Sequence, residues 1–194
     1  MTDVSDAGSS WTELRYTSSQ ALPEPDGIRD ELDGIVLWNV EAVRCFHDRP
    51  AEVVARAEVA VFDLESGLDL RAPATAYGDG IRVAAELVLT PGGALRPELG
   101  FTDVDAFVLF QQSVIGQGAR GSGLMATLLI RDRVGSRRSL VGSLPNPPTA
   151  LTTRPEFFRG VPESVQQHWW DRGLFHHGRG LWLLPPDGQA PRTP

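Results

Sequence analysis

The most informative stretch of the sequence reads Val114-Ile115-Gly116-Gln117-Gly118-Ala119-Arg120-Gly121-Ser122-Gly123-Leu124-Met125-Ala126-Thr127-Leu128-Leu129-Ile130. An apolar run, 107–110, comes just before it, and an arginine-rich segment, 131–138, follows. This order predicts a strand, a glycine-rich loop and a helix. Backbone N–H groups at such a helix start can hold phosphate oxygens, because glycines let the anion approach closely and the helix dipole favours negative charge. Arg120 would add a charged donor.

The glycine-rich loop does not match the two best-known nucleotide-binding loops. A Walker loop is excluded, because no Gly-Lys-Ser/Thr follows and the chain contains no lysine. Gly116, Gly118 and Gly121 have the spacing of a dinucleotide fingerprint, but no clear strand with an acidic end follows the helix. A helix entry whose glycines serve only close packing is the structural alternative.

A second stretch near the C-terminus makes the interpretation of the glycine-rich loop more specific. Residues 163–173 predict a short helix that ends at Gly173, and 176–184 predict a final strand. Together the two stretches resemble the GNAT superfamily of acyl-CoA-dependent N-acetyltransferases, over roughly residues 100–185. Gly121-Ser122-Gly123 matches the Gly-x-Gly part of that family's loop, and Gly173-Leu174 stands where the family has Gly-Phe.

The resemblance implies a single α/β (α+β) domain. Its mixed twisted sheet would be flanked by helices, and splayed central strands would form an acyl-CoA cleft. The chain would transfer an acetyl or other acyl group from acetyl-CoA, or another acyl-CoA, to the amine of a small molecule. The resemblance also implies the residues that bind this co-substrate: Ser113, Val114, Gly118, Ala119, Arg120, Gly121, Ser122, Gly123 and Asn146.

Candidates for proton transfer are few. Glu86 is the first candidate for the base, in an expected strand where the family sometimes has a glutamate, and Glu58 and Asp63 are weaker choices. Each also has an interpretation as a surface carboxylate. Trp169 occupies the position of the family's tyrosine acid, so His168 beside it is the remaining candidate acid.

The composition limits the classes of partner and the cellular compartment that we expect. A net charge of −7 argues against nucleic-acid or anionic-membrane binding and is compatible with an amine substrate, while a carrier protein is an alternative acyl donor. No apolar run approaches the ~20 residues of a membrane helix. The single Cys45 excludes an internal disulfide framework and favours a reducing cytoplasm. We expect no metal site, because His176 and His177 are adjacent and have no third ligand at recognisable spacing.

Patterning divides the chain into a flexible tail at 1–10, one acyltransferase domain at 11–184 and a disordered proline-rich tail at 185–194. The predicted strands are 11–16, 34–40, 57–65, 81–90, 107–114 and 139–144, and the best helix is 122–133. A long irregular connection is expected at 66–80, and a loop or lid on the substrate side at 145–161.

Two other functions stay open. One is a catalytically degenerate protein that binds acyl-CoA or a partner without turnover. The other is a nucleotide-phosphate-binding domain that uses the same glycine loop.

Overall fold

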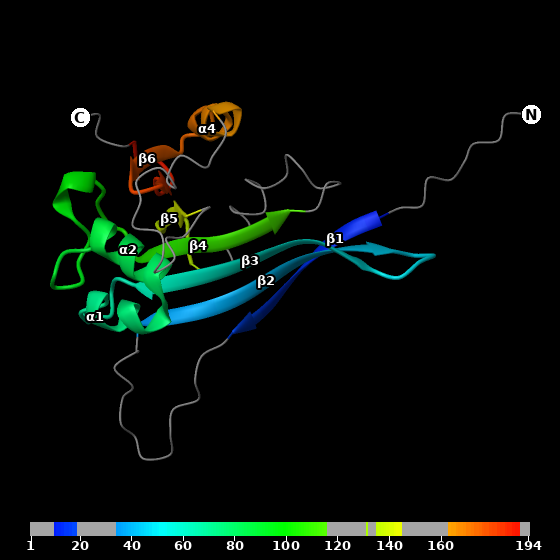
Figure 1. The fold of residues 1–194 in the computed structure, drawn as a ribbon, viewed down its shortest axis with the longest axis horizontal. Helices are drawn as coiled ribbons and strands as arrows, with labels where there is room; N and C mark the ends of the chain where they lie inside the picture. Colours follow the sequence, from blue (N-terminus) through cyan, green and yellow to red (C-terminus); the bar gives the residue numbers. More distant parts are fainter. Residues whose placement is uncertain (1–9, 19–33, 116–130, 132–134, 145–162, 191–194) are drawn as a thin grey trace, which may run out of the picture.

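A computed structural model describes residues 10–18, 34–115, 131, 135–144 and 163–190. These residues form a mixed seven-stranded sheet of order β1-β2-β3-β4-β5-β7-β6 (Figure 1). All neighbouring strands are antiparallel except β4 and β5, which are parallel. The strands are β1 (Ser10–Ser18), β2 (Ile35–Phe46), β3 (Glu52–Asp63), β4 (Ala106–Ile115), β5 (Leu140–Ser143), β6 (Phe175–Gly178) and β7 (Leu181–Leu184). The α-helices are α1 (Arg71–Ala74), α2 (Asp79–Val88) and α4 (Glu163–Trp170).

The middle of the sheet is β4, whose first half is buried on both faces. Phe107, Val108 and Leu109 are fully buried, and Phe110 is 4% exposed. A continuous apolar run of this kind is typical of a strand covered on both sides. The expected strand at 107–114 is therefore confirmed, with one more residue at each end.

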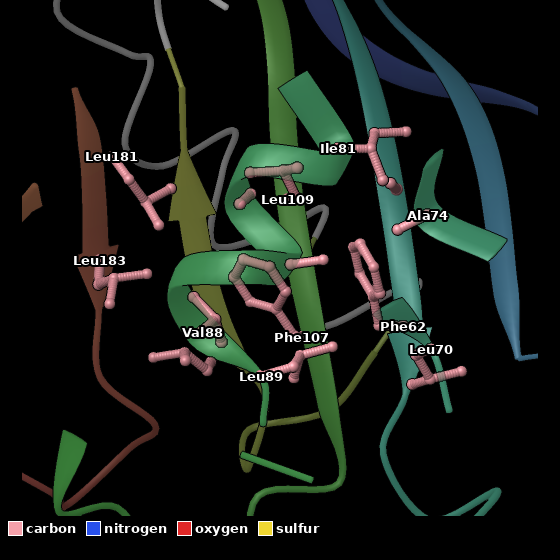
Figure 2. Close-up of a cluster of buried hydrophobic side chains, with 14 of the residues drawn as sticks. Phe62, Leu70, Ala74, Ile81, Val88, Leu89, Phe107, Leu109, Leu181 and Leu183 are labelled. Atoms are coloured by element: carbon pink, nitrogen blue, oxygen red, sulfur yellow. The ribbon is translucent and has the colours of Figure 1, made fainter. Parts of the chain in front are cut away.

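The first face of the sheet carries α2. Phe62 from β3 and Phe107 and Leu109 from β4 pack with Ile81 and Val88 of the helix in one cluster (Figure 2). On the opposite face a smaller cluster combines residues at alternate positions of the same strands. Its buried members are Val40, Val59, Val108, Phe110 and Val141.

The strand expected at 81–90 is wrong, because most of this segment is the helix α2. The sequence pattern fits both periods. Alternation runs through Val83, Ala85 and Leu87, whereas Ile81, Ala84, Ala85 and Val88 recur at the helical i, i+3, i+4, i+7 spacing. The structure buries this second set at 0–1% exposure, so packing against the sheet selects the helix.

Other elements differ in extent from the expectation. The strand expected at 57–65 begins five residues earlier, since β3 starts at Glu52. The single final strand is instead a hairpin, in which β6 and β7 pair antiparallel around Arg179 and Gly180. Both turn residues have positive φ, 45° and 79°, which reverses the chain within two residues.

Part of the expected C-terminal tail is packed. Pro185 and Pro186 are buried. Gln189 accepts a hydrogen bond from the backbone N–H of Thr102 at 3.0 Å and donates one to its carbonyl oxygen at 2.6 Å. Asp187 accepts a hydrogen bond from the buried Arg131 at 2.7 Å. The turn after β7 is thus ordered by hydrogen bonds of Asp187 and Gln189. Its proline-rich composition alone does not predict these contacts.

Gly142 of β5 offers a test of the packing around β4. A Cβ atom at this position would lie 2.7 and 2.8 Å from two ring atoms of Phe107, which is fully buried and has no room to move. We expect Gly142→Ala to lower the free energy of unfolding by about 1–3 kcal/mol, the usual cost of overpacking. Chemical denaturation measures the loss.

The matched control is Gly92→Ala, because an added Cβ at Gly92 meets nothing within 4 Å. Equal stability of the two variants would contradict the close ring-to-backbone packing.

Candidate functional site

The second half of β4 has one edge without a strand partner among the described residues. On one side β3 pairs with β4 as far as Ile115. On the other side β5 pairs only with the part from Phe107 to Phe110, and the last bond runs from the Leu144 N–H to the Phe110 carbonyl oxygen at 2.9 Å. Backbone groups on this side of β4 beyond Phe110 therefore meet no other described strand. We call the segment 111–115 the free edge of β4.

A β-bulge lies where the free edge begins. Val59 of β3 stands opposite Phe110, and the preceding Glu58 stands opposite Gln112, so Gln111 is the extra residue on β4. A bulge of this kind bends its strand and increases the local twist. The end of the pairing with β5 and the bulge of β4 thus fall at the same level of the sheet.

Glu58 lies beside the free edge, on the face of the sheet that carries α2. Ala60 and Phe62 belong to the α2 cluster, and side chains alternate along a strand, so Glu58 is on that same face. Ala60 is fully buried under the helices, whereas Glu58 is exposed. In register Glu58 stands between Asn39 of β2 and Gln112 of β4. No described residue forms a hydrogen bond or an ion pair with its carboxylate.

The structure brings only part of the expected site together. Ser113 and Val114 lie in the free edge of β4, and their side chains fall outside the described residues. The stretch 118–123 and Asn146 also lie outside the described residues. His168 belongs to α4, and its side chain is likewise outside the description.

Glu86, the first candidate base, lies on α2 and has other partners. One of its carboxylate oxygens accepts a hydrogen bond from Arg82 at 2.7 Å, and the other lies 3.6 Å from Arg179 of the β6–β7 turn. The hydrogen bond raises the pKa of the Arg82 guanidinium. Removing a proton from a substrate would require Glu86 to give up one of these ion pairs. Asp63 is also engaged, since it accepts the Glu65 N–H at 3.0 Å in a turn.

Glu86 also borders an open hollow of about 530 Å³ at the C-terminal end of α2. Its lining residues are Arg71, Glu86, Leu87, Arg96, Glu98, Leu99, His177 and Arg179. Two of them bind the carbonyl oxygens that end the helix. Arg96 donates to the Glu86 carbonyl oxygen from Nε at 3.2 Å and from Nη2 at 2.9 Å, and His177 Nε2 lies 3.3 Å from that of Leu87. Cations at a helix C-terminus satisfy unpaired carbonyls and favour the dipole. Arg96 and His177, which line the hollow, therefore have a structural role as caps of the C-terminal end of α2.

Other reactive side chains have structural roles. Cys45 is 7% exposed, and burial together with the Glu13 carboxylate raises the pKa of its thiol, which disfavours a nucleophilic thiolate. The His47 ring stacks on Trp11 with centroids 5.0 Å apart. Within the described ranges no group of three or more His, Cys, Asp or Glu could hold a metal ion. None of the described helices is long and apolar enough to span a membrane.

Trp169, which stands at the position of the family's acid, packs edge-on against Trp182 of β7, with ring centroids 5.3 Å apart. His176 lies on the same tryptophan at 5.4 Å. Burial, followed by the charge of His177, lowers the pKa of His176. Trp170 is 61% exposed. Trp169 and Trp182 thus belong to the contact between α4 and the β6–β7 hairpin, and Trp169 has no proton suited to acid catalysis.

Comparison with known proteins returns no relative. No protein-family description, no curated protein and no solved structure matches the chain.

Substitution of Arg96 tests whether its side chain stabilises the C-terminal end of α2. Arg96→Met keeps most of the aliphatic stem and removes the two donors to the Glu86 carbonyl oxygen, so we expect the free energy of unfolding to fall by about 1–2 kcal/mol. Arg71→Met is the matched control, because Arg71 lines the same hollow and its guanidinium makes no hydrogen bond or ion pair with a described residue. Thermal and urea denaturation compare the two. A larger loss for Arg71→Met would overturn the capping explanation.

Proposed function

We propose that the chain is an acyl-CoA-dependent N-acyltransferase that acts on a small amine. The observation that supports this most is the free edge of β4. It starts at a bulge between the antiparallel strands β3 and β4, at the level where the parallel pairing of β4 with β5 ends. In open sheets, ligands bind outside the carboxyl ends of parallel strands, where neighbouring connections diverge. The resemblance to GNAT acyltransferases implies the same segment, because it names Ser113 and Val114 as residues that bind the co-substrate.

The free edge suits the chemistry of the donor. The pantetheine arm of an acyl-CoA is extended and carries two amides, so it can hydrogen-bond to a strand edge as a peptide does in β-augmentation. The chain runs from Ile115 directly into the glycine-rich stretch, whose N–H groups and Arg120 would bind the pyrophosphate. Both ends of one ligand would then be bound by consecutive residues of the chain.

Within this proposal Glu58 replaces Glu86 as the candidate base. The amine nitrogen attacks the thioester carbon, the C–S bond breaks, and the proton lost by the amine passes to Glu58, directly or through one water. Backbone N–H groups of β4 polarise the thioester carbonyl, and the bound geometry supplies much of the rate. The departing thiolate takes a proton from solvent or from His168, which stays a prediction.

Trp169 favours a second candidate, a protein that binds acyl-CoA without turnover. Its indole packs on Trp182 and supplies no acid for the leaving thiolate. Binding and catalysis are therefore tested separately.

The binding test compares thermal unfolding with and without acetyl-CoA. At about a hundred times its dissociation constant the donor should add roughly 2.7 kcal/mol to the stability of the wild type. Gly121→Glu should abolish this gain, because it places a carboxylate where the pyrophosphate is expected. Gly92→Glu, which adds the same charge to an exposed turn, should leave it unchanged. No stabilisation by acetyl-CoA, longer acyl-CoAs or CoA would end the proposal.

The catalytic test follows release of the CoA thiol with a panel of small amines. Glu58→Gln should lower kcat by about 10²- to 10⁴-fold, the usual contribution of a general base, and should remove the acidic limb of the pH–rate profile. Stabilisation by acetyl-CoA should stay. Glu52→Gln, at the exposed start of the same strand, is the control and should retain full activity.

Full activity of Glu58→Gln would exclude Glu58 as the base. Binding without turnover of any amine would favour the non-catalytic alternative.

A further inference from the structure

The edge strand β1 lacks most of the features that normally prevent edge-to-edge pairing, and its two charges are of opposite sign. Natural edge strands are kept short, bulged, or interrupted by proline and lysine. β1 has nine residues, contains no proline, glycine or lysine, and pairs with β2 in an unbroken register from Ser10 to Ser18. Its outer side meets no other described element (Figure 1). A row of backbone donors and acceptors is thus presented along a straight, regular strand.

The side chains of β1 are self-complementary in one register. Antiparallel pairing of two copies requires a two-fold axis perpendicular to the sheet, which keeps each side chain on its own face and centres the ladder on a single residue. A centre at Glu13 would place two glutamates opposite each other, and a centre at Arg15 two arginines. A centre at Leu14 places Glu13 opposite Arg15 of the other copy, twice.

The register centred on Leu14 is also the longest one. Leu14 is the middle residue of β1, so Ser10 pairs with Ser18 of the other copy and the whole strand enters the ladder. Glu13 and Arg15 are exposed and form a 3.7 Å ion pair with each other within one chain. Such surface pairs contribute little to stability, so each side chain can exchange this partner for the one on the facing strand. Trp11, 43% exposed, would stand opposite Thr17 of the other copy. Opposite charges facing across strands stabilise a pair, and like charges destabilise it.

We propose that two copies of this chain associate through antiparallel pairing of β1 with β1, centred on Leu14, which joins the two sheets into one. The proposal does not depend on the acyltransferase assignment. Its tests measure mass and cross-linking, so its failure and the failure of the proposed function are distinguishable.

Disulfide trapping tests the register directly. In a full-length Cys45→Ala background, Leu14→Cys would place two cysteines directly opposite each other, about 4.5–5.5 Å apart at Cα, which is within disulfide range. Thr12→Cys lies on the same strand and the same face. However, its partner cysteine would be four residues away along the ladder, about 13 Å. We expect a covalent dimer with Leu14→Cys and none with Thr12→Cys under mild oxidation.

Charge reversal tests the pairing without a new thiol. Arg15→Glu places like charges opposite each other at two points and should weaken the dimer at least tenfold in its dissociation constant. The double variant Glu13→Arg/Arg15→Glu restores the opposite charges and should restore the dimer. Analytical ultracentrifugation gives the mass, and circular dichroism checks that each variant is folded.

A folded wild type that is monomeric at 100 μM, on the order of the weakest association to be expected of a specific dimer, would overturn the proposal. Cross-linking that is equal for Leu14→Cys and Thr12→Cys would overturn the register. A dimer that Arg15→Glu leaves unchanged would show that the copies meet at another surface.

Discussion

The buried half of β4 holds the described part of the molecule together, because it lies at the middle of the sheet with a neighbouring strand on each side and a hydrophobic cluster on each face. Phe107 and Leu109 face α2, and Val108 and Phe110 face the opposite cluster. Backbone groups in such a position have no access to water and must be paired. The backbone groups of β4 form hydrogen bonds with β3 on one edge and with β5 on the other. The antiparallel neighbour β3 and the parallel neighbour β5 therefore both pair with residues 107–110.

The change at Phe110 follows from the same constraint. Beyond this residue β4 leaves the buried part of the sheet, as the exposed Glu58 on the neighbouring strand shows. Pairing with β5 is no longer required to protect the backbone, and the extra residue Gln111 bends the strand at that level. A strand that is rigid in its first half and unpaired along one edge in its second half can hold an extended ligand in a defined direction.

Local patterning predicted most of the strands, because a buried strand such as 107–114 has an apolar run that no other element explains as well. It failed at 81–90, where Val83 and Ala85 satisfy the strand period and Ile81, Ala84 and Val88 the helix period. The choice depends on which side chains the sheet covers, and that is a tertiary effect. Glu58 was anticipated only as a weaker candidate, since nothing in the sequence places it beside the end of β5 pairing. The ion pair between Glu86 and Arg179 joins residues far apart in the chain, so the sequence alone did not predict it either.

Two of the sheet edges that have no strand partner among the described residues, those of β1 and of the end of β4, suit different partners for geometric reasons. The edge of β1 lies at the outside of the sheet, so a second strand with its own side chains and its own sheet can approach it. The free edge of β4 begins beside the end of β5 and is only five residues long, which suits a short extended ligand. β1 and β4 are three strands apart, about 14 Å, so a β1–β1 dimer leaves both free edges open. Association and ligand binding can therefore occur in one continuous sheet without competing for the same backbone groups.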